Sequence, residues 1–71
     1  MKYIVIVEKA DQGYGAYVPD LPSCIATATT RDEVLRLIKE AIGFHIEGLL
    51  EAGLPVPPSV SVSELVEVTA A

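Results

Sequence analysis

The sequence predicts an α+β fold: a two-layer β-β-β-α-β domain with a mostly antiparallel sheet and one helix on one face. Two observations predict it. Three short stretches rich in β-branched and small residues come first, and they are separated by turn-forming residues. A single long stretch with helical spacing of apolar residues follows, and another β-branched stretch comes after it. The length of 71 residues suits one domain, so residues 1–71 are expected to form a single domain.

The first two strands are predicted to form a hairpin. Residues 2–9 are β-branched and apolar on both faces, which is typical of a central strand. A turn signal covers residues 11–13, and residues 14–18 then alternate as a second strand. Because the two stretches are so close in the sequence, we expect them to pair antiparallel.

A third strand is expected over residues 24–29, where small and β-branched residues alternate as in an edge strand. Pro19 and Pro22 separate it from the second strand, because a proline cannot donate a hydrogen bond to a ladder. We expect the third strand to run in the same direction as the first.

Residues 31–52 are predicted to form the single helix. Thr30 and Glu33 have the spacing of a capping box, in which the Thr30 hydroxyl accepts from the Glu33 amide. Gly53 is expected to be the left-handed cap, with Pro55 beyond the end. Helical spacing places one apolar face toward the sheet: Val34, Leu35, Ile38, Ala41, Ile42, His45, Ile46 and Leu49. The opposite face is expected to carry Arg36, Lys39, Glu40, Gly43, Glu47 and Glu51.

Residues 55–58 are predicted to be a stiff, extended connector that returns the chain to the sheet; a proline-rich ligand motif is the alternative. Residues 64–69 are then predicted as a fourth strand that carries Leu65, Val66 and Val68. A right-handed crossover with the first strand at the centre gives the sheet order 3-2-1-4. One helix covers only one face of such a sheet, so the other face needs another chain to cover it.

Charge is distributed unevenly along the chain. Five Lys and Arg against ten Asp and Glu give a net charge of −5. Residues 1–39 hold all five bases and five acids, whereas residues 40–71 hold five acids and no base. This acidic half would repel a nucleic-acid backbone and attract a basic protein. The alternative is that the acidity only keeps a small protein soluble.

Candidate catalytic and ligand-binding residues are sparse. Gly13 and Gly15 precede a strand, not a helix, so they do not make a dinucleotide-binding motif. Cys24, the single cysteine, is expected to be a buried small hydrophobe. His45, the single histidine, is expected at the core boundary, with a partner contact as the alternative. No central strand position carries Asp or Glu, so we expect a protein that is not an enzyme, with no catalytic residue, metal or cofactor.

Membrane insertion and export are also not expected. The longest apolar run, residues 3–7, is too short to cross a membrane. Glu8 and Lys9 follow that run too soon for a signal peptide. With one cysteine and no export signal, a cytoplasmic location is expected.

Four stretches together resemble a known family. They are Met1-Lys2-Tyr3 with Glu8, Tyr14 to Pro22 followed by Ser23-Cys24, Thr30-x-x-Glu33 leading to Glu40-Ala41-Ile42 and Phe44 to Leu49, and Gly53 to Pro57. Over nearly its whole length the chain is similar to the N-terminal domain of the HicB antitoxin family. It departs from the family pattern at Ser23, where a glycine is usual, and at Ala28-Thr29, where Gly-Asp is common.

The resemblance implies a degraded ribonuclease-H-like fold with β-β-β-α-β order. It also implies a partner, HicA, a small basic ribonuclease toxin that cuts messenger RNA and that HicB proteins block by binding. Full-length members often add a C-terminal DNA-binding domain that represses their own operon. Because this chain stops at Ala71, no such domain, and no direct nucleic-acid binding, is expected.

The expected function is an interaction domain that binds and occludes a HicA-like toxin. The alternative is a solitary oligomeric scaffold or regulatory domain with no toxin. The predicted partner-binding residues are Leu37, Phe44, Glu47 and Glu51. Leu37 and Phe44 lie on one shoulder of the helix, beside the small residues Ala41 and Gly48. A homo-oligomer is expected through this shoulder or through the open sheet face, unless residues 54–58 fold back over the shoulder.

Overall fold

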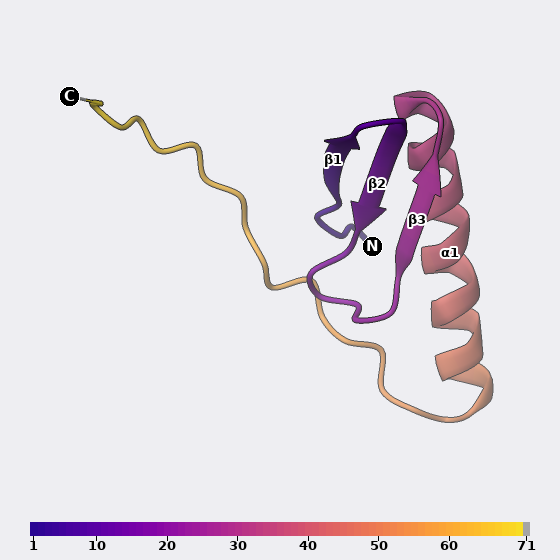
Figure 1. Ribbon diagram of the computed structural model, residues 1–71. Helices are drawn as coiled ribbons and strands as arrows, with labels where there is room; N and C mark the ends of the chain where they lie inside the picture. The colour runs from indigo at the N-terminus through magenta and orange to yellow at the C-terminus, as the bar shows by residue number, and fades with distance from the viewer. Residues whose placement is uncertain (71) are drawn as a thin grey trace.

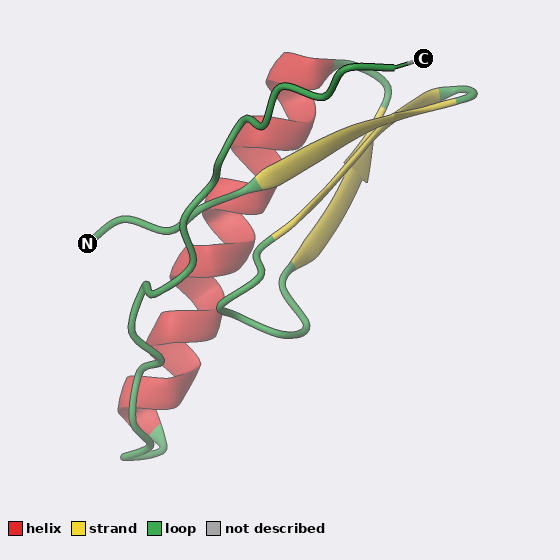
Figure 2. Cartoon of the chain, turned by 90° about the vertical axis from the view of Figure 1, so that its left-hand side faces the viewer, coloured by secondary structure: helices red, strands yellow, loops and turns green. Residues whose placement is uncertain are grey.

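The computed structural model describes residues 1–70 and has a two-layer α+β architecture (Figure 1). Strands β1 (Ile6–Ala10), β2 (Gly13–Tyr17) and β3 (Ile25–Ala28) precede helix α1 (Arg31–Glu51). The sheet is antiparallel throughout, and α1 packs on one of its faces against β2 and β3 (Figure 2). The predicted α+β class, the hairpin and the single helix are therefore confirmed.

The strand register decides which side chains face α1. Tyr17 pairs with Ile6 on one side and with Ile25 on the other, so these three form one row across the sheet. Ala16 pairs with Val7 in the neighbouring row. Ala16 is buried against α1, and successive side chains alternate between faces. The Ile6–Tyr17–Ile25 row therefore lies on the face that α1 does not cover.

Two turns need unusual backbone conformations. Gly13, at the start of β2, has a φ of 146°, and a Cβ there would collide with the carbonyl oxygen of Ala28. In the loop between β2 and β3, Ser23 has a φ of 84°. That loop folds back on itself, because the Val18 amide donates to the Cys24 carbonyl at 3.2 Å. The segment with Pro19 and Pro22, which was predicted to separate the second and third strands, therefore forms a compact corner between β2 and β3.

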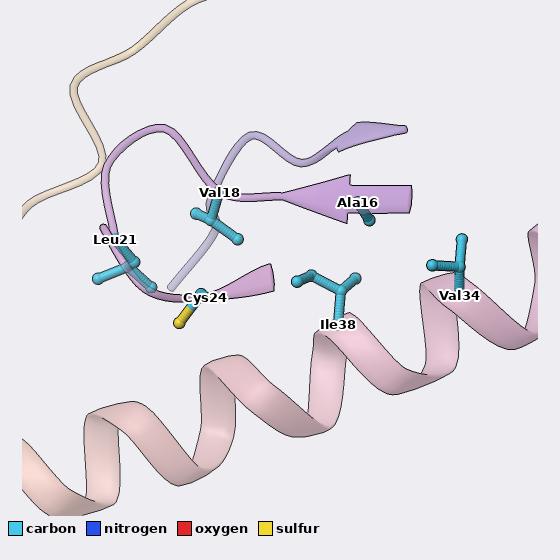
Figure 3. Packing of buried hydrophobic residues seen from close by; sticks show 6 residues of the cluster. All are labelled: Ala16, Val18, Leu21, Cys24, Val34 and Ile38. Atoms are coloured by element: carbon cyan, nitrogen blue, oxygen red, sulfur yellow. The ribbon is translucent and has the colours of Figure 1, made fainter. Parts of the chain in front are cut away.

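The hydrophobic core lies between α1, β2 and the β2–β3 corner (Figure 3). Two of its members come from α1 and the others from β2 and the corner, and all are at most 4% exposed: Ala16, Val18, Leu21, Cys24, Val34 and Ile38. The corner therefore contributes packing as well as a change of direction.

Helix α1 begins and ends as the sequence predicts. The Thr30 hydroxyl accepts a hydrogen bond from the Glu33 amide at 3.1 Å. Gly53 has a φ of 69°, and the Leu54 amide donates to the Leu49 carbonyl at 2.9 Å. Every residue of the predicted sheet-facing side is buried or half-buried, and every residue predicted opposite it is exposed. The amphipathic pattern is confirmed.

The predicted fourth strand and the order 3-2-1-4 are wrong for the chain as described. Within residues 1–70 the sheet has three strands in the order β1-β2-β3, so β2 is the central strand and β1 is an edge. Of the predicted first strand, residues 2–9, only residues 6–9 are paired, and β1 extends one residue further to Ala10. Residues 64–69 are extended and exposed, and they pair with no strand. A strand-type sequence forms a strand only where another backbone is present to pair with it.

The connector after α1 is held in place by contacts with residues far away in the sequence. The Tyr3 hydroxyl donates to the Pro57 carbonyl. The Asp20 carboxylate accepts from the Val60 amide at 3.0 Å, the Ser61 amide at 2.9 Å and the Ser61 hydroxyl at 2.7 Å. Beyond Ser61 the chain runs away from the body of the domain (Figure 1). We call residues 62–70 the tail.

Candidate protein-interaction surface

Three of the four residues predicted to bind a partner lie on the exposed side of α1. Leu37, Phe44 and Glu51 follow one another at seven-residue spacing, which is close to two helical turns, and Glu47 lies one turn after Phe44. Phe44, Glu47 and Glu51 are exposed, whereas Leu37 is half-buried at the edge of the sheet-facing side. We call this set the acidic face of α1.

Phe44 is the apolar centre of the acidic face. Its side chain is 74% exposed, although it is the only phenylalanine in the chain. Together with Glu40, Gly43 and Glu47 it lines an open hollow on the helix surface. A Cβ at Gly43 would meet no side chain from elsewhere in the fold within 4 Å, so the helix surface is open at this position. Exposed aromatic rings beside such hollows are typical anchor points of protein interfaces.

The charge around Phe44 is unfavourable for the helix itself. Arg36 lies 3.2 Å from Glu40 and 3.9 Å from Glu33, but among residues 1–70 no salt bridge involves Glu47 or Glu51. The last turn of α1 contains no basic residue. Carboxylates near a helix C-terminus repel the negative end of the helix dipole. The two glutamates therefore do not serve helix stability, and a basic partner would relieve the repulsion.

The connector does not cover this surface. Phe44 remains largely exposed, and Leu54 at the start of the connector is exposed as well. The hydrogen bond between Tyr3 and Pro57 leads the connector toward the N-terminal segment. The alternative in which residues 54–58 fold back over Leu37 and Phe44 is therefore wrong.

A second exposed apolar surface lies on the open sheet face. Ile25 is 71% exposed and its cross-strand neighbour Tyr17 is partly exposed, whereas Ile6 is half-buried. This row carries no charged residue. The face that α1 does not cover therefore exposes apolar side chains, chiefly that of Ile25.

Of the residues considered for chemistry, Cys24 is buried and His45 is half-buried. Cys24 is 3% exposed, its sulfur lies 4.0 Å from the Ala41 carbonyl oxygen, and burial raises the pKa of its thiol. A catalytic cysteine needs the opposite shift. His45 is half-buried on the sheet-facing side of α1. Within residues 1–70, no group of three or more histidine, cysteine, aspartate and glutamate residues is arranged to hold a metal ion.

Asp20 is a residue whose role the sequence did not indicate. The Ser61 hydroxyl, together with the Ser61 and Val60 amides, lowers the pKa of its carboxyl group. Asp20 thereby fixes the point from which the tail leaves the domain. Its partners are 40 and 41 residues away in the sequence, so no local pattern connects them.

No helix in the described part of the chain has the length and apolar character needed to cross a membrane.

Comparisons with known proteins point to one family. A family model described as a HicB-like antitoxin of bacterial toxin-antitoxin systems matches residues 3–70. Among solved structures, a chain of a HicA3 and HicB3 toxin-antitoxin complex is similar, with a TM-score of 0.69 and 30% sequence identity. That similarity covers 83% of this chain and 70% of the other.

Curated relatives include proteins of different length. An uncharacterised 14.9 kDa protein of Haemophilus phage HP1 is 39% identical over 66 residues, which cover 93% of this chain and 50% of the phage protein. A UPF0150 protein of Thermoplasma acidophilum is 43% identical over 58 residues, which cover 80% of this chain and 84% of that protein. This chain therefore spans half of the phage relative and most of the archaeal one.

Proposed function

Because the chain belongs to the HicB-like antitoxin family, we propose that it binds and occludes a small, basic, mRNA-cleaving toxin of the HicA type. The observation that carries the proposal is the acidic face of α1, where Phe44 is exposed near Glu47 and Glu51, which have no salt-bridge partners among residues 1–70. The similarity to a chain of the HicA3 and HicB3 complex supports it.

The proposed mechanism is occlusion. The carboxylates of Glu47 and Glu51 take the place of RNA phosphates on the basic surface of the toxin. Phe44 enters an apolar pocket of the toxin, where desolvation strengthens the surrounding charge pairs. The toxin can then no longer reach its RNA. This mechanism requires no chemistry from the antitoxin. Because a HicA-type toxin acts on messenger RNA, we place the complex in the cytoplasm.

A second candidate function is an oligomeric scaffold or regulatory domain that has no toxin. The exposed Ile25 side chain and the exposed apolar tail favour self-association whether or not a toxin exists. The two functions differ in one requirement, because only the antitoxin function needs the acidic face of α1 to bind a basic protein.

Charge reversal on the acidic face tests the proposal. We expect Glu47→Lys combined with Glu51→Lys to slow association with a purified HicA-type toxin by about tenfold or more at low salt, because electrostatic steering is lost. The difference should shrink at physiological salt, where charges are screened within roughly 8 Å. Stopped-flow or surface plasmon resonance measurements give the association rate.

The matched control is Glu8→Lys combined with Asp11→Lys. Both residues are exposed, and the change in net charge is the same. They lie at the β1–β2 hairpin, away from the C-terminal half of α1 (Figure 1). Equal slowing by both pairs would attribute the effect to net charge and would refute the acidic face as the docking surface. A toxin that binds none of these proteins would favour the scaffold.

A further inference from the structure

The tail has the sequence of a β-strand but, within residues 1–70, no partner strand. Valines occupy positions 62, 66 and 68 of the tail and position 60 just before it, and the positions between them in this period-2 pattern are mostly Ser, Glu and Thr. In the structure these valines and Leu65 are among the most exposed apolar side chains, and Leu65 is 103% exposed. Apolar residues in a period-2 pattern gain stability only when a sheet buries one side of the strand.

The tail also makes the molecule unusually long. The radius of gyration of the Cα atoms is 14.4 Å, whereas a compact chain of this length has about 11 Å. The longest dimension is 52 Å against 27 Å and 16 Å for the others. The base of the tail is held by the three hydrogen bonds to Asp20, so the tail leaves the domain in a defined direction.

An acceptor for such a strand exists on the same chain. β1 pairs with β2 along one edge only, and its other edge is unpaired within residues 1–70. An unpaired edge presents free backbone N–H and C=O groups that readily accept another strand. Val5 and Val7, on the α1 side of this edge, are only half-buried because α1 packs mainly on β2 and β3.

The charge pattern selects one register. Lys9 is the only charged residue of β1 on the α1 side, and Glu64 is the only charged residue on the valine side of the tail. An antiparallel pairing with Glu64 opposite Lys9 places Val66 opposite Val7 and Val68 opposite Val5. Opposite charges and apolar pairs that face each other across strands both stabilise a sheet.

An antiparallel pairing of the tail with β1 cannot be made within one chain. The tail leaves the domain near the corner between β2 and β3, at the end of the sheet where β1 begins (Figure 1). Folding back onto its own β1 would therefore give a parallel strand. With Glu64 at Lys9, that parallel strand would place Val62 opposite Val7 and Val60 opposite Val5, but it would carry Val66 and Val68 beyond Ala10, where β1 ends. The antiparallel match requires a tail that arrives from a second copy.

We infer that the tail is the edge strand of a second copy of this chain. Two copies related by a two-fold axis exchange their tails, and each tail adds an antiparallel strand to the β1 edge of the other. The exchange is reciprocal, so the assembly closes as a dimer. The inference does not depend on a toxin, because both the donor strand and the acceptor edge belong to this chain.

Sedimentation velocity of the full chain and of a Val66→Lys and Val68→Lys variant tests the inference. We expect the wild type to be dimeric at micromolar concentration, and the variant to raise the dimer dissociation constant by at least about tenfold. Ile25→Lys is the matched control, because Ile25 is as exposed as the valines but lies on the open sheet face. A monomeric wild type, or dissociation by Ile25→Lys but not by the tail substitutions, overturns the inference. Circular dichroism verifies that each variant is folded, since none of these residues belongs to the core.

A disulfide test reports the register directly. In a Cys24→Ala background, Val5→Cys and Val68→Cys are made in separate chains, which are mixed and oxidised. The predicted register yields a covalent heterodimer in the mixture only. A mixture that stays uncross-linked while the wild type is a dimer overturns the proposed pairing.

Discussion

Removal of the Phe44 ring tests the centre of the proposed toxin-binding surface. Phe44 is 74% exposed in the free chain. A phenylalanine side chain buries at least about 150 Å² when it is fully covered, so an interface can remove about 110 Å² or more of this ring from water. At about 25 cal/mol per Å² this burial contributes roughly 2–3 kcal/mol. Phe44→Ala should therefore weaken toxin binding by about thirtyfold or more.

The assay is isothermal titration calorimetry with a purified HicA-type toxin. The Phe44 ring lies outside the core, so the substitution should leave the fold intact, and alanine is a better helix former than phenylalanine. Ile25→Ala is the control, because Ile25 is also an exposed apolar residue but lies on the open sheet face and not on α1. The reasoning is refuted if Phe44→Ala changes affinity less than twofold, or if Ile25→Ala weakens binding equally.

Three further predictions concern activity, the anchor of the tail and the core. The purified protein should show no metal-dependent cleavage of RNA, and cleavage that is lost on mutating Glu8 or His45 would contradict this. Asp20→Asn should speed hydrogen exchange at the Val60 and Ser61 amides, whereas the exposed control Asp11→Asn should not. Because folding lowers the pKa of Asp20, its anchoring contribution should be complete above pH 3.8 and should disappear as the pH falls through the lowered folded-state value. Ile38→Ala should destabilise the fold by about 2–5 kcal/mol in urea denaturation, because Ile38 is fully buried; a loss below about 1 kcal/mol would contradict the assigned core.

The features that the sequence predicted correctly depend on neighbouring residues. The cap at Thr30, the left-handed Gly53 and the sheet-facing side of α1 follow from spacings of three to seven residues. The hollow beside Phe44 was missed, although Glu40, Gly43, Phe44 and Glu47 have the i, i+3, i+4, i+7 spacing of one helix face.

The features that the sequence did not predict depend on contacts between distant segments. Alternation over residues 64–69 indicates a strand but does not specify which edge accepts it, so the order 3-2-1-4 could not be secured from the pattern. Apolar residues on both sides of residues 2–9 suggested a central strand, yet β1 lies at an edge. Apolar residues on both faces indicate how far the faces are covered, not how many strands flank the strand, and residues 4–7 are half-buried on both faces although β1 is an edge.

The two proposed surfaces are compatible because they use different elements. The acidic face belongs to the exposed side of α1, whereas the exchanged tail would pair with the outer edge of β1, and α1 packs on β2 and β3 (Figure 2). A tail-exchanged dimer would therefore leave both acidic faces open, and each could hold one toxin. Substitutions on the two surfaces share no contact, so their free-energy effects should add. If the tail substitutions weakened toxin binding as strongly as Phe44→Ala does, the tail would belong to the toxin interface and the two surfaces would not be independent.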